Sequence, residues 1–280
     1  MLRIENLKFS YFKKGIPALD GINAAVEPGI YLLAGENGAG KTTLLHLLAG
    51  VMIPTQGSIS INGANPAADR PDLKGTTFLL EENTSFPMKD IRSFARIHSP
   101  FYPNFSPQRF EENLRAFGLT GYERAKSLSL GTRKKSLLAY TLALGVDILL
   151  LDEPTNALDI ESKEILKRLI AVNMDENRTL IVSTHTVSEL ENLFDGALML
   201  RGGRLLWAGT AEEATGRLAF RKTRADDPDA LYSEKGLAGA LSILLASEEE
   251  EPTKADWRLL YSALHSPKAD DILKTLIRTN

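Results

Sequence analysis

The feature that most constrains the fold of this chain is a glycine-rich segment between an apolar strand pattern and a helical pattern. Residues 29–33 are apolar enough for a buried strand, and four leucines within residues 44–48 have helix-compatible spacing. The segment between them matches G-x-x-x-x-G-K-[ST] and consists of Gly35, Glu36, Asn37, Gly38, Ala39, Gly40, Lys41, Thr42 and Thr43. A strand, a glycine-rich loop and a helix in this order predict a phosphate-binding loop, or P-loop.

The chemistry of this loop suits a nucleoside triphosphate. Its glycines allow the backbone to wrap around phosphates, and successive N–H groups with the positive end of the following helix bind the anion. Lys41 is expected to reach the β and γ phosphates as a binding and catalytic residue, and the Thr42 hydroxyl to ligate magnesium. We therefore predict ATP and Mg²⁺ as cofactors, with a chance glycine-rich turn as the alternative.

A second motif is an apolar strand that ends in two adjacent carboxylates. Residues 148–151 are apolar, and Asp152, Glu153 and Pro154 follow them directly. Ligand sites in parallel sheets lie at the carboxyl ends of the strands. We predict that Asp152 holds magnesium, directly or through water, and that Glu153 acts as the general base on the attacking water. The alternative is that Glu153 only caps the segment that follows.

The remaining pattern predicts an α/β fold. Residues 1–26 indicate short antiparallel strands, and residues 83–127 carry helical periodicity, which indicates a small helical lobe. Residues 147–152 and 179–183 are short apolar runs typical of buried parallel strands joined by helical crossovers. After about residue 210 the composition changes, and the last part reads as a separate, partly helical C-terminal appendage.

Composition excludes several classes of function. The formal net charge of -3 and the pI near 5.9 give no overall attraction to phosphate backbones, so we expect no nucleic-acid partner. The chain has no cysteine, which excludes disulfides and thiolate metal sites. Its start lacks a secretory signal pattern, and its apolar runs fall far short of the roughly 20 residues of a spanning helix. We expect a cytoplasmic protein.

Residues 128–133, with the sequence LSLGTR, resemble the signature segment of ABC ATPases, usually written LSGGQ. Ser129 and Gly131 are retained, whereas Leu130 and Thr132 replace the usual glycine and glutamine. The resemblance implies that Ser129 and Gly131 contribute a hydroxyl and backbone N–H groups to the γ phosphate bound by the opposite subunit. Taken alone, the segment would be an ordinary helix N-cap.

Further motifs follow in the order that this family shows. Residues 156–159 resemble the D-loop, and residues 183–185 end in His185, where the family places a switch histidine that contacts the γ phosphate and orients water. Tyr11 stands where these ATPases place an aromatic residue that stacks on adenine. The alternatives are a satisfied polar histidine, a core tyrosine, and Phe12 as the stacking residue.

One departure from the family pattern concerns the Q-loop at the entrance to the helical lobe. Residues 78–83 occupy its place, and Glu81 stands where glutamine is expected. A carboxylate is a stronger ligand for a hard cation than an amide, so we predict Glu81 as a metal ligand, with a solvent-facing Glu81 as the alternative. The basic residues 133–135 and the acidic residues 248–251 are interpreted as solvated surface, although the basic run is also compatible with a docking or phosphate patch.

The resemblance predicts a P-loop NTPase core of ABC ATPase type with an antiparallel β subdomain, occupying residues 1–210, and a helical lobe at about 83–135. Residues 211–280 form the C-terminal appendage. It implies that two such subunits, identical or different, sandwich two MgATP molecules beneath an integral membrane permease on the inner face of the cell membrane. The helical lobe looks most like that of bacterial subunits that serve small exporters or peptide-antibiotic resistance. The rivals are a soluble non-transport ABC ATPase and a low-turnover regulatory ATP-binding module.

Overall fold

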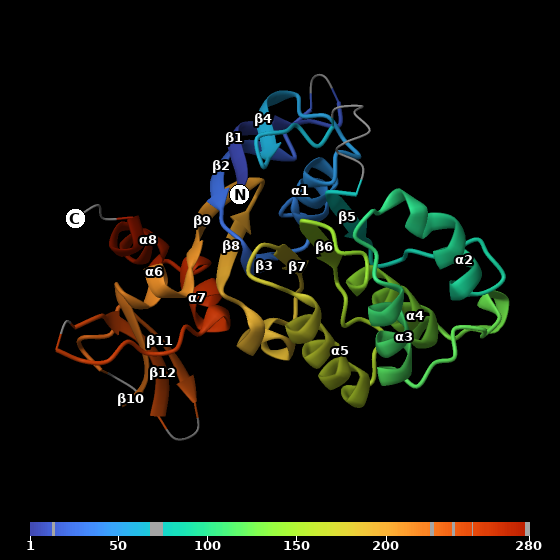
Figure 1. The fold of residues 1–280 in the computed structure, drawn as a ribbon. Coiled ribbons are helices and arrows are strands. Elements are labelled where there is room, and N and C mark those ends of the chain that lie inside the picture. Colours follow the sequence, from blue (N-terminus) through green and yellow to red (C-terminus); the bar gives the residue numbers. More distant parts are fainter. Residues whose placement is uncertain (13–14, 68–74, 225–226, 237–238, 248, 278–280) are drawn as a thin grey trace.

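A computed structural model describes residues 1–12, 15–67, 75–224, 227–236, 239–247 and 249–277. Its centre is a six-stranded sheet in which five strands are parallel and the last one is antiparallel to its neighbour (Figure 1). In spatial order the strands are β5 (Thr77–Leu80), β6 (Ile148–Asp152), β7 (Thr179–Ser183), β3 (Gly29–Gly35), β8 (Gly196–Arg201) and β9 (Arg204–Thr210). Every residue of β6 and β7 is buried, which explains their continuous apolar sequence.

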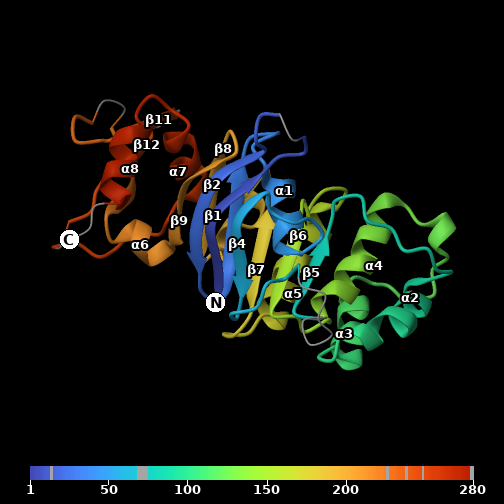
Figure 2. The same cartoon turned by 90° about the horizontal axis from the view of Figure 1, so that it is seen from above.

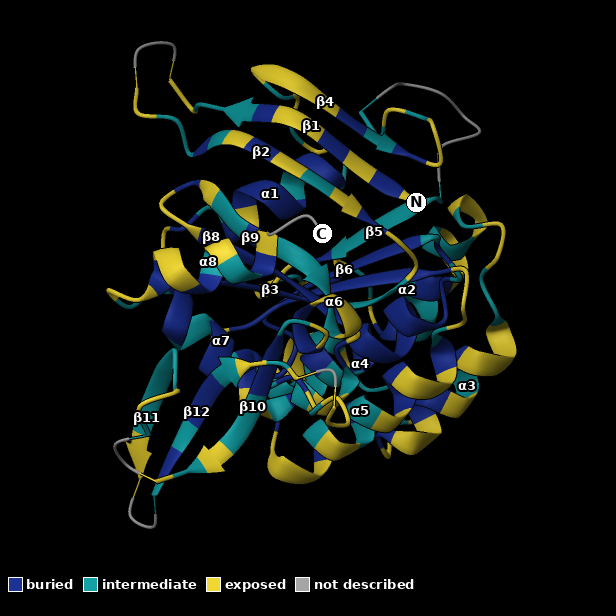
Figure 3. Cartoon of the chain, turned by 90° about the vertical axis from the view of Figure 1, so that its left-hand side faces the viewer, coloured by how far each residue is buried: buried dark blue, intermediate teal, exposed yellow. Residues whose placement is uncertain are grey.

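A second, antiparallel sheet covers one face of this core. It has the order β2 (Leu19–Val26), β1 (Leu2–Phe9) and β4 (Gln56–Ile61). Helix α1 (Lys41–Leu48) lies between the two sheets, and its four leucines pack with both in one apolar cluster. Figure 3 shows the alternation of buried and exposed residues along β1 and β2 that a half-buried sheet requires.

The other face carries helix α5 (Ile160–Asn173) and leads to the predicted helical lobe. The lobe consists of α2 (Ile91–His98), α3 (Pro107–Ala116) and α4 (Leu130–Leu142), so α4 extends past residue 135. Tyr140 of α4 is fully buried, and its ring contacts those of Phe94, Phe105 and Phe110. These aromatic contacts fix α4, and with it the segment before it, against the rest of the lobe.

The C-terminal part contains a sheet that the sequence analysis did not predict. Its strands have the order β10 (Leu218–Thr223), β12 (Gly239–Leu245) and β11 (Tyr232–Gly236), accompanied by the helices α6 (Ala211–Thr215), α7 (Trp257–Leu264) and α8 (Ala269–Ile277). Figures 1 and 2 place this part and the helical lobe at opposite ends of the central sheet. Short 3-10 helices complete the described elements: η2 (Ser99–Phe101), η3 (Ala125–Ser127), η4 (Val187–Glu189) and η5 (Glu191–Leu193).

The predicted α/β fold with a parallel core, an antiparallel subdomain and a helical lobe is confirmed. The C-terminal helices, however, share the core of the preceding residues. Trp257 is 1% exposed, its ring centroid lies 6.1 Å from that of Trp207 in β9, and its indole Nε1 donates to the carbonyl of Phe194 at 3.4 Å. Apolar packing therefore crosses the proposed domain boundary between residues 210 and 211. The division into two domains at this point stays a prediction.

Among the residues that the structure describes, no helix combines the length and apolarity needed to cross a membrane.

Because the C-terminal helices share an apolar core with the preceding residues, we expect both parts to unfold in one transition. Trp257→Ala removes a fully buried indole, so we expect it to lower the free energy of unfolding of the whole chain by about 4 kcal/mol. Scanning calorimetry should show one main transition that moves to a lower temperature, while Leu245→Ala, at a position that is 61% exposed, leaves it in place. A separate early transition for the C-terminal part, with the main transition unmoved, would contradict this account.

Candidate nucleotide-binding site

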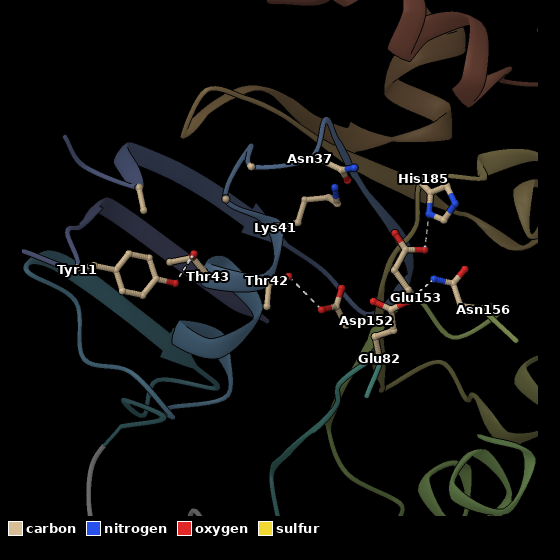
Figure 4. A pocket seen from close by; sticks show the side chains of 13 residues that line it. Tyr11, Asn37, Lys41, Thr42, Thr43, Glu82, Asp152, Glu153, Asn156 and His185 are labelled. Atoms are coloured by element: carbon tan, nitrogen blue, oxygen red, sulfur yellow. Dashed lines mark hydrogen bonds and ion pairs between the residues drawn. The ribbon is translucent and has the colours of Figure 1, made fainter. Parts of the chain in front are cut away.

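A cavity of about 520 Å³ opens at the carboxyl ends of the central strands (Figure 4). Its lining combines the P-loop with side chains that follow β5, β6 and β7, so segments far apart in sequence meet there. The lining residues are Tyr11, Ala18, Asn37, Gly38, Gly40, Lys41, Thr42, Thr43, Glu82, Asp152, Glu153, Asn156 and His185. This position agrees with the rule for ligand sites in parallel sheets.

The P-loop has the conformation that its glycines permit. Gly38 and Gly40 have φ values of 81° and 102°, in the left-handed region that other residues avoid. A Cβ on Gly40 would also lie 2.6 Å from the side chain of Leu19. Because Gly40 is the N-cap of α1 and has no side chain to bond the first N–H groups, the start of this helix is available to an anion.

Lys41 lies at the floor of the loop and is only 8% exposed. Its Nζ donates to the backbone carbonyls of Gly35 at 2.7 Å and Glu36 at 3.2 Å. Burial lowers the pKa of the Lys41 ammonium from its ordinary value, and the carboxylates of Glu153 and Asp152 partly offset that effect. The loop thus holds its lysine in place through its own carbonyl groups.

Thr42 and Asp152 bring two oxygen ligands together. The Thr42 hydroxyl donates to Asp152 Oδ2 at 3.1 Å, and the Ser183 hydroxyl of β7 donates to the other carboxylate oxygen. A hydroxyl and a carboxylate, side by side at the phosphate end of a P-loop, form the kind of oxygen donor set that Mg²⁺ prefers. The chemistry of the pair therefore fits a magnesium ion bound together with phosphates.

Glu153 and His185 form the opposite wall of the cavity. His185 Nδ1 lies 3.0 Å from Glu153 Oε2. The Glu153 side chain is nearly buried and points into the cavity beside Asp152, as Figure 4 shows. Its backbone has a φ of 47°, and its N–H donates to the carbonyl of Ser183 at 3.0 Å. A left-handed non-glycine residue held this way is a feature that clusters at functional sites.

The structure places Glu81 outside the lining of the cavity. Strand β5 ends at Leu80, and the Glu81 carboxylate turns to His46 in the last turn of α1, with 2.5 Å between Oε1 and Nε2. Of these two neighbouring glutamates, Glu82 lines the cavity, and its carboxylate accepts a hydrogen bond from Asn156 Nδ2 at 2.6 Å. The turn after β5 thus directs these two successive side chains to different sides, and the role of Glu81 as a metal ligand stays a prediction.

Tyr11 lies at the edge of the cavity, where its hydroxyl is 2.9 Å from the Thr43 hydroxyl. Its ring is packed edge-on against Phe9 with 5.0 Å between centroids, and 56% of the residue is exposed. Tyr11 is therefore not a core aromatic. Phe12 is 78% exposed and is not among the residues that line the cavity. The adenine contact of Tyr11 stays a prediction.

Ser129 and Gly131 lie outside the cavity of their own chain. Ser129 is exposed and caps α4 by accepting a hydrogen bond from the backbone N–H of Thr132 at 3.1 Å. Gly131 sits so close to the D-loop segment that a Cβ would lie 2.6 Å from the carbonyl oxygen of Ala157. The chain thus does not bring its signature segment to its own P-loop.

Three residues that line the cavity were not predicted as site residues: Ala18, Glu82 and Asn156. Asn156 was noted only as the first residue of the D-loop resemblance. The interpretation of residues 133–135 as solvated surface was also wrong, because Lys134 is 5% exposed and Lys135 forms an ion pair with Asp159 at 3.2 Å. A run of three basic residues on a helix gives no signal that one of them faces inward.

Comparison with known proteins agrees with this geometry. Residues 19–156 match the family model described as ABC transporter. The ATP-binding protein NatA of Bacillus subtilis strain 168 is 28% identical over 243 residues, which cover 83% of this chain and 96% of that protein. An uncharacterized ABC transporter ATP-binding protein, YybJ, of the same strain is 32% identical, with 72% and 94% covered. A lantibiotic transport ATP-binding protein, SrtF, of Streptococcus pyogenes is 31% identical, with 74% and 89% covered.

Solved structures show the same fold. The ATP-binding subunit of an ABC transporter aligns with a TM-score of 0.67 at 24% identity, covering 76% of this chain and 91% of that one. A dimeric ATP-binding cassette in a post-hydrolysis state with ADP and Pi aligns with a TM-score of 0.65 at 22% identity, covering 75% and 98%. With relatives above 30% identity covered over most of their length, the chain belongs to the family of ABC transporter ATP-binding proteins.

Proposed function

We propose that this chain hydrolyses MgATP and uses the closing and opening of a dimer to drive transport through a separate membrane subunit. The observation that carries the proposal is the meeting of three groups in one cavity: the P-loop with Lys41, the oxygen pair of Thr42 and Asp152, and the pair of Glu153 and His185. These are the parts that phosphoryl transfer to water needs, namely phosphate binding, charge neutralisation and water positioning.

ATP binding begins at the P-loop. The N–H groups at the start of α1 receive the β and γ phosphates, and Lys41 exchanges its carbonyl contacts for phosphate oxygens. Thr42 and Asp152 hold magnesium, which supplies positive charge to the β and γ phosphate oxygens. Tyr11, already at the cavity edge, stacks on the adenine.

Hydrolysis depends on Glu153 and His185, which form the cavity wall opposite the P-loop. Glu153 accepts a proton from the attacking water as the oxygen bonds to the γ phosphorus, and the bond from that phosphorus to the oxygen of ADP breaks. The short distance between His185 and Glu153 supports a role for the histidine in orienting the same water and contacting the γ phosphate. Lys41 stabilises the negative charge of the transferred group.

A second chain completes the site. Ser129 is exposed and Gly131 is half-buried at the start of α4, and both lie outside their own cavity, which supports their contribution to the γ phosphate of a partner subunit. That partner is a second ABC ATPase subunit. The names of NatA and SrtF, which refer to transport, support an integral membrane permease as the other partner and a location on the inner face of the membrane.

Two substitutions should separate binding from chemistry. Lys41→Ala removes the charge that faces the β and γ phosphates and should weaken MgATP binding by more than about 10-fold. Glu153→Gln keeps the shape of the site and should retain binding while the turnover rate falls at least about 100-fold. Equilibrium nucleotide binding and phosphate release measure the two quantities, with Lys8→Ala on β1, whose partner is Asp20, as the control. Unchanged phosphate release in Glu153→Gln would remove it from the role of base.

The adenine contact can be tested with neighbouring aromatic residues. Tyr11→Ala should weaken MgATP binding about 10-fold while the turnover rate at saturating ATP stays within about 2-fold, because base stacking contributes about 1–3 kcal/mol and does not touch the reacting atoms. Phe12→Ala is the matched control and should change neither quantity. If Phe12→Ala weakens binding and Tyr11→Ala does not, the stacking residue is Phe12 instead.

A further inference from the structure

A buried lysine that the proposed chemistry does not use lies directly behind the cavity. Lys134 of α4 is 5% exposed, and its Nζ donates to the backbone carbonyl of Glu82 at 3.3 Å. Burying a cation is costly unless opposite charge lies close by. Three carboxylates supply that charge: Glu82, Asp152 and Glu153 raise the pKa of Lys134, although burial lowers it by more.

The cavity needs positive charge nearby. Its lining carries three carboxylates, those of Glu82, Asp152 and Glu153, against a single lysine, Lys41. The ligand proposed for this cavity is an anion even with its magnesium. Glu82 adds negative charge at the entrance to the helical lobe, and the ammonium group of Lys134 bonds the backbone carbonyl of the same residue. Removing Lys134 would therefore leave the site with an excess of negative charge facing the phosphates.

We propose that Lys134 is a positioning residue of the nucleotide site: the buried counter-charge that allows the Glu82 carboxylate to remain in the cavity lining when MgATP binds. It also ties the segment that carries Glu82 to α4, the helix that Ser129 caps. The inference rests on the proposed function and names a residue that this function left unused. The proposal couples the charges of residues 82 and 134: removing both charges should restore the affinity that is lost when only the Lys134 charge is removed.

The pairing is tested by a double-mutant cycle on nucleotide affinity. Lys134→Met keeps an unbranched side chain and removes the charge, so it should weaken MgATP binding on the order of 10-fold. MgADP carries one negative charge fewer, so the same substitution should weaken MgADP binding only about 3-fold. Glu82→Gln added to Lys134→Met restores the charge balance and should return MgATP affinity to within about 2-fold of wild type.

The controls separate charge from structure. Lys167→Met removes a lysine of α5 that pairs with Glu164 on the surface, and it should leave affinity unchanged. Lys134→Gln retains a donor for the Glu82 carbonyl without the charge, and it should behave as Lys134→Met does. Thermal unfolding of each variant confirms that the compared proteins are folded. Because Lys134→Met removes one member of a group of buried charges, it is expected to unfold at a lower temperature than Lys167→Met, so affinities are compared at a temperature at which every variant is folded.

Three results would overturn the proposal: wild-type affinity in folded Lys134→Met, no recovery in the double variant, or wild-type affinity in Lys134→Gln, which would assign the effect to the hydrogen bond. Phosphate release by the wild-type chain is measured alongside and reports on the proposed function by itself. A wild type that binds MgATP with the expected cycle and releases no phosphate would contradict hydrolysis while supporting the role of Lys134.

Discussion

The hydrogen bond between the Thr42 hydroxyl and Asp152 is the contact around which this site is organised. It joins residues 110 positions apart and holds the start of α1 at the end of β6. The parallel pairing of β6, β7 and β3 makes this possible, because it places the ends of all three strands at one edge of the sheet. Ser183 at the end of β7 bonds the same carboxylate, so the P-loop, Asp152 and the segment that leads to His185 are held together at this edge of the sheet.

The balance of positive and negative charge determines whether this cavity can hold a nucleoside triphosphate. A site that binds a triphosphate and also needs a carboxylate base has to place negative groups near negative phosphates. Here Lys41 faces the cavity from the P-loop, and Lys134 lies behind the Glu82 segment. The helical lobe therefore contributes a charged side chain to the surroundings of the nucleotide site. Helix α4 carries Ser129 at its exposed start, where the proposed dimer would place a second chain, and it carries the buried Lys134 toward the Glu82 segment of its own cavity.

The sequence predicted those features that depend on local pattern. The P-loop, the apolar run of β6 and the order of motifs have fixed spacings, and the fold and family they predicted are confirmed. Sequence could not show that Glu81 lies outside the cavity lining, because the turn after β5 decides which of two adjacent carboxylates faces the cavity. Lys134 was missed because its burial depends on packing between α4 and a distant segment. The C-terminal sheet was missed because β10 (LAFRKT) and β11 (YSEKG) contain charged residues and neither shows a strict alternation of buried and exposed positions.

In the proposed mechanism, the cavity of one chain is half of the working site, and the signature segment of another chain supplies the rest. The most direct test measures the rate of phosphate release per chain together with molecular mass over a wide range of protein concentration. If the claim holds, the rate per chain falls on dilution as ATP-dependent dimers dissociate. A chain of monomeric mass with a rate per chain that does not change on dilution would contradict it.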